Sequence, residues 1–191
     1  MKRAMNPLRG GLLAGLGLLA AGLAPQVLAA DYVQQRGGLS FVGQYQGETF
    51  TGLFPGFSTR LQFDPANPAA AKLDVEIPLA GADTRNGERD STLKGADFFN
   101  VARFATARYI AQGFTALGGE RYRADGTLQL RGISKPVSLT FTLSGGDNPV
   151  LVGQAVVKRL DFDIGTGDWA DLSIIPNNID VATRVTFRKL P

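Results

Sequence analysis

The sequence of 191 residues contains no cysteine and no histidine. Without histidine the chain has no Ser-His-Asp triad, no imidazole base and no histidine ligand for zinc or haem. Without cysteine it has no disulfide, no iron–sulfur cluster and no thiol nucleophile. The enzyme classes that remain use paired carboxylates, a serine–lysine pair or a tyrosine, so the composition favours a binding protein over an enzyme.

A net positive charge is also missing once the N-terminal segment is set aside. The chain carries 20 Lys and Arg against 17 Asp and Glu, and Lys2, Arg3 and Arg9 precede the first acidic residue. The remainder is balanced at 17 basic and 17 acidic residues. This balance removes the main electrostatic reason to expect a nucleic-acid partner, so none is predicted.

The first 29 residues have the pattern of a secretory signal peptide. The basic residues precede an apolar run from Gly10 to Ala24, which is shorter than the roughly 20 residues of a membrane-spanning helix. Val27 and Ala29 are small enough for the two recognition positions of a cleavage site. We predict a signal peptide over residues 1–29, one domain over residues 30–191 with no membrane span, and a periplasmic or secreted location in a Gram-negative bacterium.

Apolar and polar residues alternate with a period of two through much of residues 30–191. This alternation predicts strands with one dry and one wet face, and clusters of Gly, Pro, Asn and Asp separate them. Many short alternating strands on one chain predict an all-β antiparallel barrel or sandwich. The dry faces are formed by Leu39, Phe41 and Tyr45, by Leu61 and Phe63, by Leu73, Val75 and Ile77, by Tyr122, Leu128 and Leu130, by Val137, Leu139 and Phe141, and by Ile179, Val181, Val185 and Phe187.

One predicted strand, Ala105 to Phe114, carries mostly small residues on one face. Ala105, Ala107, Tyr109, Ala111 and Gly113 share that face and fill little volume. If the face points inward, it leaves a space that a close-packed core would not leave. The alternative is that bulky residues of neighbouring strands fill this space.

The alternation stops between Ala82 and Ala105, and we expect short helical segments around residues 85–104. Within them, the polar stretch DSTLKGADFFN carries two adjacent aromatic residues, Phe98 and Phe99. At the end of a barrel, this pair would serve as a plug that completes the core or as a contact to a bound ligand. The sequence leaves both roles open.

Charged residues in two segments suggest further chemistry. Arg89, Asp90 and Lys94 are interpreted as paired or solvated surface charge, with a role in holding a ligand headgroup as the alternative.

The carboxylates around Trp169 miss the Asp-x-Asp-x-Asp-Gly spacing of a calcium loop and lack its closing glutamate, so no metal site is predicted. Trp169 itself is a buried loop anchor or an aromatic that faces a partner. The carboxylates are those of Asp161, Asp163, Asp168 and Asp171.

Four segments in succession resemble the YceI family of exported, lipocalin-like isoprenoid-binding proteins. They are LQFDP from Leu61, RDSTLKGADFFNVARF from Arg89, GTLQLRGISKPVSL from Gly126 and RLDFDIGTGDWAD from Arg159. The last resembles the branch of the family that carries Gly-Asp-Trp-Ala-Asp. Two positions depart from the pattern, since Thr92 stands where many members have histidine and Asp163 where glycine is usual.

The resemblance implies an extended eight-stranded antiparallel lipocalin-like barrel, a size at which the interior holds one small ligand. It also implies a non-catalytic protein that transports or stores a long apolar ligand. This ligand would be an isoprenoid quinone, a polyprenyl chain or a fatty-acid-type lipid. No other cofactor is expected. Members of this branch are associated with cytochrome b561-type membrane proteins, and a homodimer is left open. The alternatives are a hydrolase in the same barrel, with carboxylates or a Ser/Lys pair, and a partner-binding barrel without ligand.

The predicted ligand-binding residues are the apolar residues expected to face the interior. No catalytic residue and no metal ligand is predicted. The predicted lining consists of Phe41, Leu61, Phe63, Leu73, Val75, Ile77, Phe98, Phe99, Tyr109, Leu128, Leu139, Phe141 and Trp169.

The signal peptide leads to a prediction about the exported protein. If residues 1–29 are removed on export, the intact mass of protein recovered from the periplasm should correspond to a chain that begins at or near Ala30. A mass that includes the leader would contradict the predicted location.

Overall fold

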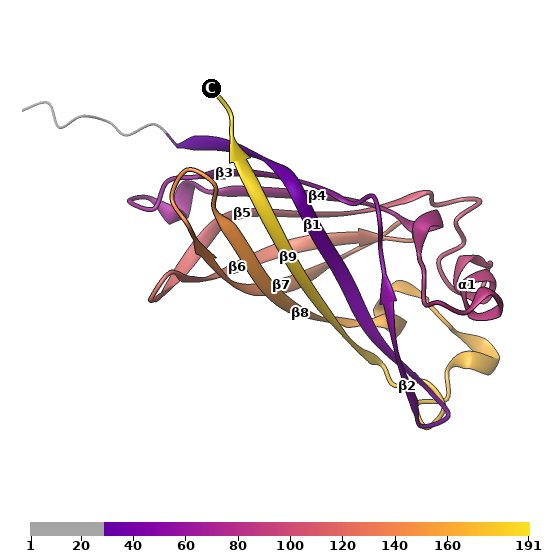
Figure 1. The fold of residues 1–191 in the computed structure, drawn as a ribbon. Coiled ribbons are helices and arrows are strands. Elements are labelled where there is room, and N and C mark those ends of the chain that lie inside the picture. Colours follow the sequence, from indigo (N-terminus) through magenta and orange to yellow (C-terminus); the bar gives the residue numbers. More distant parts are fainter. Residues whose placement is uncertain (1–28) are drawn as a thin grey trace, which may run out of the picture.

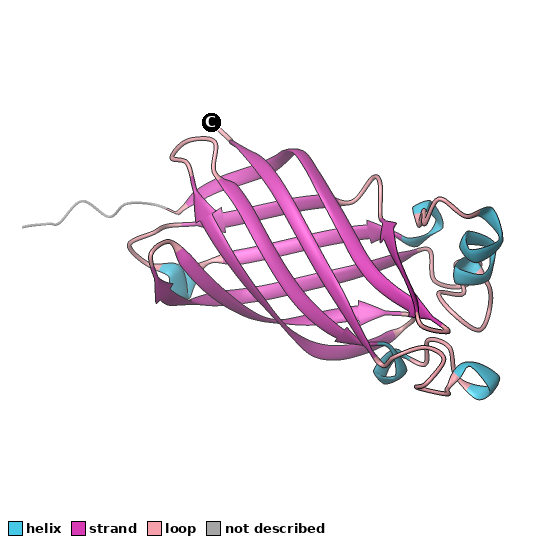
Figure 2. Cartoon of the chain, turned by 60° about the horizontal axis from the view of Figure 1, so that its bottom comes forward, coloured by secondary structure: helices cyan, strands magenta, loops and turns pink. Residues whose placement is uncertain are grey.

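Eight antiparallel strands close into a barrel in the computed structural model, which describes residues 29–191 (Figures 1 and 2). Each strand pairs with the next around the ring, and pairing of the last strand with the first closes it. The predicted eight-stranded antiparallel barrel is therefore confirmed, whereas the predicted signal peptide lies outside the described residues. The ring consists of β1 (Ala30–Tyr45), β3 (Ser58–Phe63), β4 (Lys72–Pro78), β5 (Thr106–Gly118), β6 (Arg121–Leu130), β7 (Ile133–Ser144), β8 (Val150–Lys158) and β9 (Asn178–Lys189).

A ninth strand, β2 (Glu48–Leu53), shares one edge of β1 with β3. The first residues of β1, Ala30 to Val33, pair with β3, and its last residues, Ser40 to Tyr45, pair with β2. The barrel therefore splays at the end where β2 replaces β3. We call this end the mouth, and the opposite end, where both described chain ends lie, the closed end (Figure 1).

Short helices and loops gather at the mouth (Figure 2). They belong to two segments, residues 79–105 with η2 (Leu79–Gly81) and α1 (Gly87–Lys94), and residues 159–177 with η3 (Arg159–Phe162) and η4 (Gly167–Trp169). A further turn, η1 (Pro68–Ala70), lies at the closed end. The helical segments expected around residues 85–104 are confirmed for α1, and turns follow it up to Arg103.

Helix α1 begins at a polar cap and is fixed to the preceding chain by side chains. The Asn86 side chain accepts a hydrogen bond from the backbone N–H of Arg89 at 3.0 Å, as expected of a good N-cap. Asp90 accepts hydrogen bonds from the N–H and the hydroxyl of buried Thr84, at 2.8 and 2.6 Å. Desolvation raises the pKa of Asp90, but these two bonds, together with the nearby charges of Lys94 and Arg89, outweigh it, so the pKa is lowered. Asp90 thus holds the helix in place.

A bulge in β5 changes which residues of that strand face inward. The register of β5 with β6 shifts between Ala111 and Phe114, and Gly113 adopts a left-handed backbone, with φ of +77°. A side chain at position 113 would meet the carbonyl oxygen of Ala69 at 3.0 Å, while Phe114 turns inward and is 4% exposed. The expectation that Gly113 continues the inward face was wrong, because a bulge interrupts the period of two.

The closed end of the barrel is filled by aromatic side chains from four strands. Phe63, Phe114, Tyr122 and Phe141 form a circuit of ring contacts, with centroids 5.1 to 6.0 Å apart. We call these residues the four-ring cluster. All four are buried, so this half of the barrel has the close packing of a protein core.

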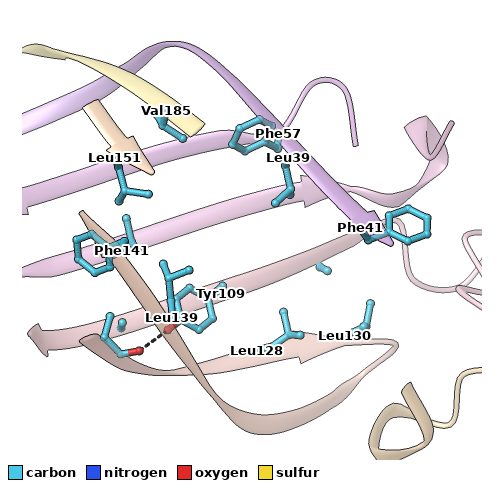
Figure 3. Close-up of a cluster of buried hydrophobic side chains, with 14 of the residues drawn as sticks. Leu39, Phe41, Phe57, Tyr109, Leu128, Leu130, Leu139, Phe141, Leu151 and Val185 are labelled. Atoms are coloured by element: carbon cyan, nitrogen blue, oxygen red, sulfur yellow. Dashed lines mark hydrogen bonds between the residues drawn. The ribbon is translucent and has the colours of Figure 1, made fainter. Parts of the chain in front are cut away.

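Tyr109 lies flat against the neighbouring strand because residue 126 is glycine. A Cβ atom at Gly126 would come within 2.5 Å of the Tyr109 ring and 2.7 Å of the carbonyl oxygen of Ile110. The phenol oxygen lies 2.9 Å from the carbonyl oxygen of Ala124 and 3.1 Å from that of Val137, and Figure 3 shows the ring beside Leu139. Burial, and secondarily the Asp125 carboxylate, raises the pKa of Tyr109 to about 12.

The raised pKa of Tyr109 predicts a loss of stability in alkali. The folded state holds the phenol proton more tightly than the unfolded chain, whose tyrosine pKa is near 10.0. The stabilisation is therefore complete below about pH 10 and is lost as pH rises through 12, and a shift of two units corresponds to about 2.7 kcal/mol at most. Urea unfolding at pH 8 and pH 11.5 should show this loss in the wild type and a smaller one in Tyr109→Phe.

The comparison with Tyr109→Phe is needed because burial also raises the pKa of Tyr32. Ionisable groups other than Tyr109 change the free energy of unfolding of both proteins equally with pH. Their contributions therefore cancel when the losses of the wild type and Tyr109→Phe are subtracted. Equal losses in the two proteins would show that Tyr109 does not carry the effect.

Candidate ligand-binding site

The half of the barrel next to the mouth encloses an apolar cavity of about 490 Å³. Its wall is built from the inward faces of all eight ring strands and of β2, and from both mouth segments. Nearly all of the wall is aliphatic or aromatic; among its polar side chains, Asn86, Glu88, Arg89 and Thr92 belong to the mouth segment of residues 79–105, and Thr59 lies at the inner end. This size and composition are those of a site for one small apolar molecule.

The structure divides the predicted lining residues into two groups. Leu61, Phe63 and Phe141 lie in the packed closed half, away from the cavity. The period of two identifies the inward face of a strand, but not how far along the strand the hollow extends. That any of the residues on the wall contacts a ligand stays a prediction. Those on the wall are Phe41, Leu73, Val75, Ile77, Phe98, Phe99, Tyr109, Leu128, Leu139 and Trp169.

Two alternatives were considered for the small residues of strand β5: that they leave a space, or that bulky residues of neighbouring strands fill it. The structure shows both along this one strand. Ala107 and Tyr109 line the cavity, so small side chains there do leave space. Ala111 lies below the cavity and is 1% exposed, because bulky residues such as Phe114 fill that level. One strand thus contributes to the hollow half and to the packed half of the barrel.

Several wall residues were not predicted. Those of β8, among them Leu151, Ala155 and Val157, are hidden in the sequence because this strand is apolar on both faces. Its outward residues Val152 and Val156 are 42% and 52% exposed. A second group follows β1 near the mouth, where no alternation gives a signal, and consists of Phe50, Phe54 and Phe57.

The two phenylalanines of the mouth, Phe98 and Phe99, join segments that lie far apart in the sequence. The Phe98 ring packs edge-on against Trp169, with centroids 5.3 Å apart, and the Phe99 ring lies 5.8 Å from that of Phe54. Trp169 also contacts Tyr45 of β1 at 6.4 Å, so it serves as a loop anchor. Phe98 and Phe99 are 6% and 8% exposed and line the cavity, so they close the mouth and face the interior at once.

Arg159 organises the second mouth segment from inside. The side chain is 3% exposed, and its five N–H groups donate to the backbone carbonyls of residues 164, 165, 169, 175 and 176. No carboxylate of residues 29–191 lies within ion-pairing distance of it. Burial lowers the pKa of Arg159, but a guanidinium stays charged in proteins. A single cation therefore holds the loop by charge-assisted hydrogen bonds.

A second arginine, Arg131, connects the two mouth segments. One of its terminal nitrogens donates to the carbonyl oxygens of Phe98 and Asp163, at 2.8 and 2.7 Å. Arg131 and Gly132 form the tight turn between β6 and β7, with φ of +53° and +78°, as in a type I′ hairpin. A backbone bond from Gly165 to Asp97 joins the same segments at 2.7 Å. The mouth is thus one connected structure.

The cavity opens past a polar rim that includes Asn86, Glu88, Arg89 and Thr92. The Arg89 guanidinium lies over the Phe50 ring, 4.1 Å from its centroid. It donates to the hydroxyl and the carbonyl oxygen of Thr84 at 2.9 and 3.1 Å. These bonds use two of its five N–H donors, and the other three have no hydrogen-bond partner within residues 29–191. The rim therefore offers donors to a polar group at the opening.

The wall holds few groups that could perform catalysis. Within residues 29–191, Glu88 is the single carboxylate on the wall, and no serine or lysine lies there. That part of the chain also contains no cluster of three Asp or Glu residues placed to hold a metal ion. No helix within residues 29–191 is long and apolar enough to cross a membrane.

Residues 33–187 match the family model of the YceI-like domain. The chain belongs to the YceI-like family. It is 34% identical over 185 residues to protein YceI of Escherichia coli O157:H7, with 89% of this chain and 94% of that protein covered. It is also 34% identical over 164 residues to a UPF0312 protein of Ectopseudomonas mendocina, with 80% and 86% covered.

Solved structures similar to this YceI-like chain have the same barrel. BcnA of Burkholderia cenocepacia superposes with a TM-score of 0.75 at 25% identity, covering 78% of this chain and 95% of that one. A polyisoprenoid-binding domain of Saccharophagus degradans, implicated in plant cell wall breakdown, superposes with a TM-score of 0.64 at 16% identity. That match covers 85% and 99% of the two chains and at such low identity shows the fold alone.

The structure explains why Asp163 can stand at the position where the resemblance to the YceI family predicts glycine. This residue ends η3 in the left-handed conformation, with φ of +54°. Glycine adopts that conformation without strain, and aspartate is among the few other residues that tolerate it. The substitution therefore keeps the turn whose carbonyl Arg131 binds.

The hydrogen bonds of Arg159 predict that its replacement by methionine opens the mouth. Arg159→Met keeps an apolar stem but leaves five carbonyls without donors. Charged hydrogen bonds contribute about 1.5–3 kcal/mol each and do not add in full, so we expect a loss of roughly 3–5 kcal/mol in the free energy of unfolding. Amide exchange should accelerate in residues 164–176.

A matched variant, Arg159→Lys, retains the charge but supplies three donors from one point. It should fall between wild type and Arg159→Met in both measurements. An Arg159→Met protein with wild-type stability and exchange would contradict the role assigned to the side chain.

Proposed function

We propose that this protein is an exported carrier that holds one apolar lipid chain inside its barrel, for transport or storage in the periplasm. The observation that carries the proposal is the apolar cavity of about 490 Å³, packed shut at one end and bordered by polar groups at the other. A binding function of this kind requires no catalytic residue.

The wall favours a ligand with a long apolar body and a small polar end. Deep in the cavity, the Tyr109 hydroxyl is occupied by backbone carbonyls, and the buried Thr59 hydroxyl has no hydrogen-bond partner within residues 29–191. The rest of the inner wall is apolar and offers little to a polar body. A polar end would lie at the rim, where Arg89 has donors to spare and Thr92 and Asn86 lie nearby. Isoprenoid and fatty-acid-type lipids, quinones among them, meet this description, and the Saccharophagus degradans domain is described as binding a polyisoprenoid.

Two other functions receive less support. A hydrolase with paired carboxylates or a Ser/Lys pair would need those groups in the interior, and the described wall offers Glu88 at the rim. A barrel that binds only protein partners would need no hollow, and an apolar cavity of this size forfeits contacts that a filled core would make. Filling the cavity with a ligand restores those contacts.

The energetics explain why such a carrier would need a place to unload. Each methylene group of a bound chain contributes about 0.8 kcal/mol on leaving water, and a lipid chain held in the cavity would bury roughly a dozen of them. The gross driving force is then on the order of 10 kcal/mol, and release into water is slow. Unloading at a membrane or at a cytochrome b561-type membrane protein is therefore part of the proposal, and a homodimer is left open.

The carrier function predicts that the protein co-purifies with lipid. Protein exported to the periplasm and purified without detergent should release an apolar chain molecule on extraction with organic solvent, detected by mass spectrometry. Phe99→Leu keeps much of the aromatic volume but removes a ring from the wall, so it should lower occupancy with little loss of stability. Protein that is repeatedly empty would contradict the carrier function.

The Phe99 variant needs two comparisons. Phe162→Leu makes the same change at a buried phenylalanine that does not line the cavity, and it should lower stability without lowering occupancy. Replacing both Phe98 and Phe99 by Ala should cost stability as well as ligand, since each loss of a core aromatic costs about 3–5 kcal/mol. If Phe99→Leu and the double Ala variant both retain full lipid occupancy, Phe98 and Phe99 serve only as a plug that closes the barrel.

A further inference from the structure

We infer that the outer face of the barrel over β8, β9 and β1 binds a second copy of this chain, in a dimer whose two-fold axis passes beside Ala182. Such a dimer would form whether or not the barrel carries lipid. Three features of the molecule point to it: the side chains that face outward on these strands, the register that aligns them, and the symmetry of the two charges among them.

The outer surface of the barrel has a charged side and a weakly charged side. On β4, β5 and β6, outward residues form two ion pairs, Asp74 with Arg108 and Asp125 with Arg123. On the opposite side of the ring, over β8, β9 and β1 (Figure 1), two charges stand among small and apolar side chains. We call this side the β9 face, and it consists of the outward residues within 38–42 of β1, 152–156 of β8 and 180–184 of β9.

Three valines of the β9 face are exposed, and they border its two charged residues. Val42 and Val156 pair with Asp180 from either side and are 40% and 52% exposed. Val152 pairs with Arg184 and is 42% exposed. Single exposed apolar residues are common, but a group of them on adjacent strands is typical of an interaction site. The face therefore offers apolar area together with one charge of each sign.

The middle of the β9 face is low, because its side chains are small. Gly38, Ser40 and Ala182 lie there, and the Ser40 hydroxyl donates to the carbonyl oxygen of Ala182 at 3.3 Å. The outside of a barrel is convex, so large side chains at its crest would hold a second barrel away. Small ones let two backbones approach, and the valines on β8 can then reach the copy from the flank.

The register makes the face symmetric about Ala182. Ser40 and Gln154 pair with Ala182, while Asp180 and Arg184 lie two residues before and two residues after it on β9. A two-fold axis that lies between two such faces and crosses β9 at a right angle beside Ala182 sets the two β9 strands face to face and antiparallel. The residue two positions before Ala182 then meets the residue two positions after it in the copy, as in any isologous interface.

This arrangement matches opposite charges and apolar side chains. Asp180 meets Arg184 of the copy, and by symmetry a second such pair forms, while Val152 and Val156 meet in the same way on β8. Within residues 29–191 of one chain, neither Asp180 nor Arg184 has an ion-pair partner. An axis parallel to β9 would instead set each charge against its own copy, so the charges select the antiparallel arrangement.

Sedimentation velocity of the purified protein between ~1 and ~500 µM tests the dimer, because weak interfaces associate in this range. The wild type should shift from monomer to dimer. Asp180→Arg turns both ion pairs into pairs of like charge and should raise the dissociation constant at least ~tenfold. Combining Asp180→Arg with Arg184→Asp restores opposite charges and should return the dissociation constant to within about threefold of the wild-type value.

A matched control makes the same change of charge on the other side of the barrel. Asp125→Arg removes an exposed ion pair on β6, which costs little, and should leave the dissociation constant unchanged. All the substituted side chains are exposed, so these proteins should fold, and circular dichroism checks this. None of the outward residues of the β9 face lines the cavity, so lipid occupancy should also stay that of the wild type.

Each outcome separates the dimer from the carrier function. A wild type that stays monomeric up to ~500 µM would overturn the dimer. A dimer that Asp180→Arg leaves intact, or that the exchange of both charges fails to restore, would overturn its assignment to the β9 face. Monomeric protein that sediments with vesicles of phosphatidylethanolamine and phosphatidylglycerol, and loses this binding in Val156→Glu, would overturn the dimer and assign the face to a lipid surface. A protein that dimerises as expected but is repeatedly empty would contradict the carrier function and leave the dimer standing.

Discussion

Closure of the sheet by β1 and β9 is the constraint on which the rest of the structure depends. These strands pair from Tyr32 with Lys189 to Val42 with Asp180, with one irregularity at Gln34. A closed ring has no free edge, and its eight strands fix an interior that is just wide enough for side chains or for one small ligand. Whether a level of the barrel is packed or hollow then depends only on the side chains that point into it.

The barrel of this chain is packed in one half and hollow in the other. At the closed end, aromatic residues from four strands meet and fill the width of the barrel. Toward the mouth, Ala107, Val75 and Val181 replace them, and a cavity remains. The same ring of hydrogen bonds therefore supports a stable core and a binding site, and the packed half offsets the contacts that the hollow half lacks.

Two arginines hold the mouth without carboxylate partners. Arg159 binds five backbone carbonyls from inside its own segment, and Arg131 binds one carbonyl from each segment. Since both guanidinium groups are used in this way, Arg89 is the arginine of the described rim that is placed to meet a ligand. Its position over Phe50 orders the side chain before any ligand binds.

The sequence by itself determined most of the strands and their inward faces, because a period of two is a local property of each strand, and the order of its motifs, which matched one family, decided for the closed barrel. Ten of the thirteen residues that it predicted as lining, from Phe41 to Trp169, lie on the wall. Only the tertiary structure decided that Leu61, Phe63 and Phe141 lie beneath the cavity and that Phe114 joins them. The depth of a hollow depends on which side chains of different strands meet at one level, and a bulge or a shift of register changes that level without leaving a trace in the alternation of any single strand.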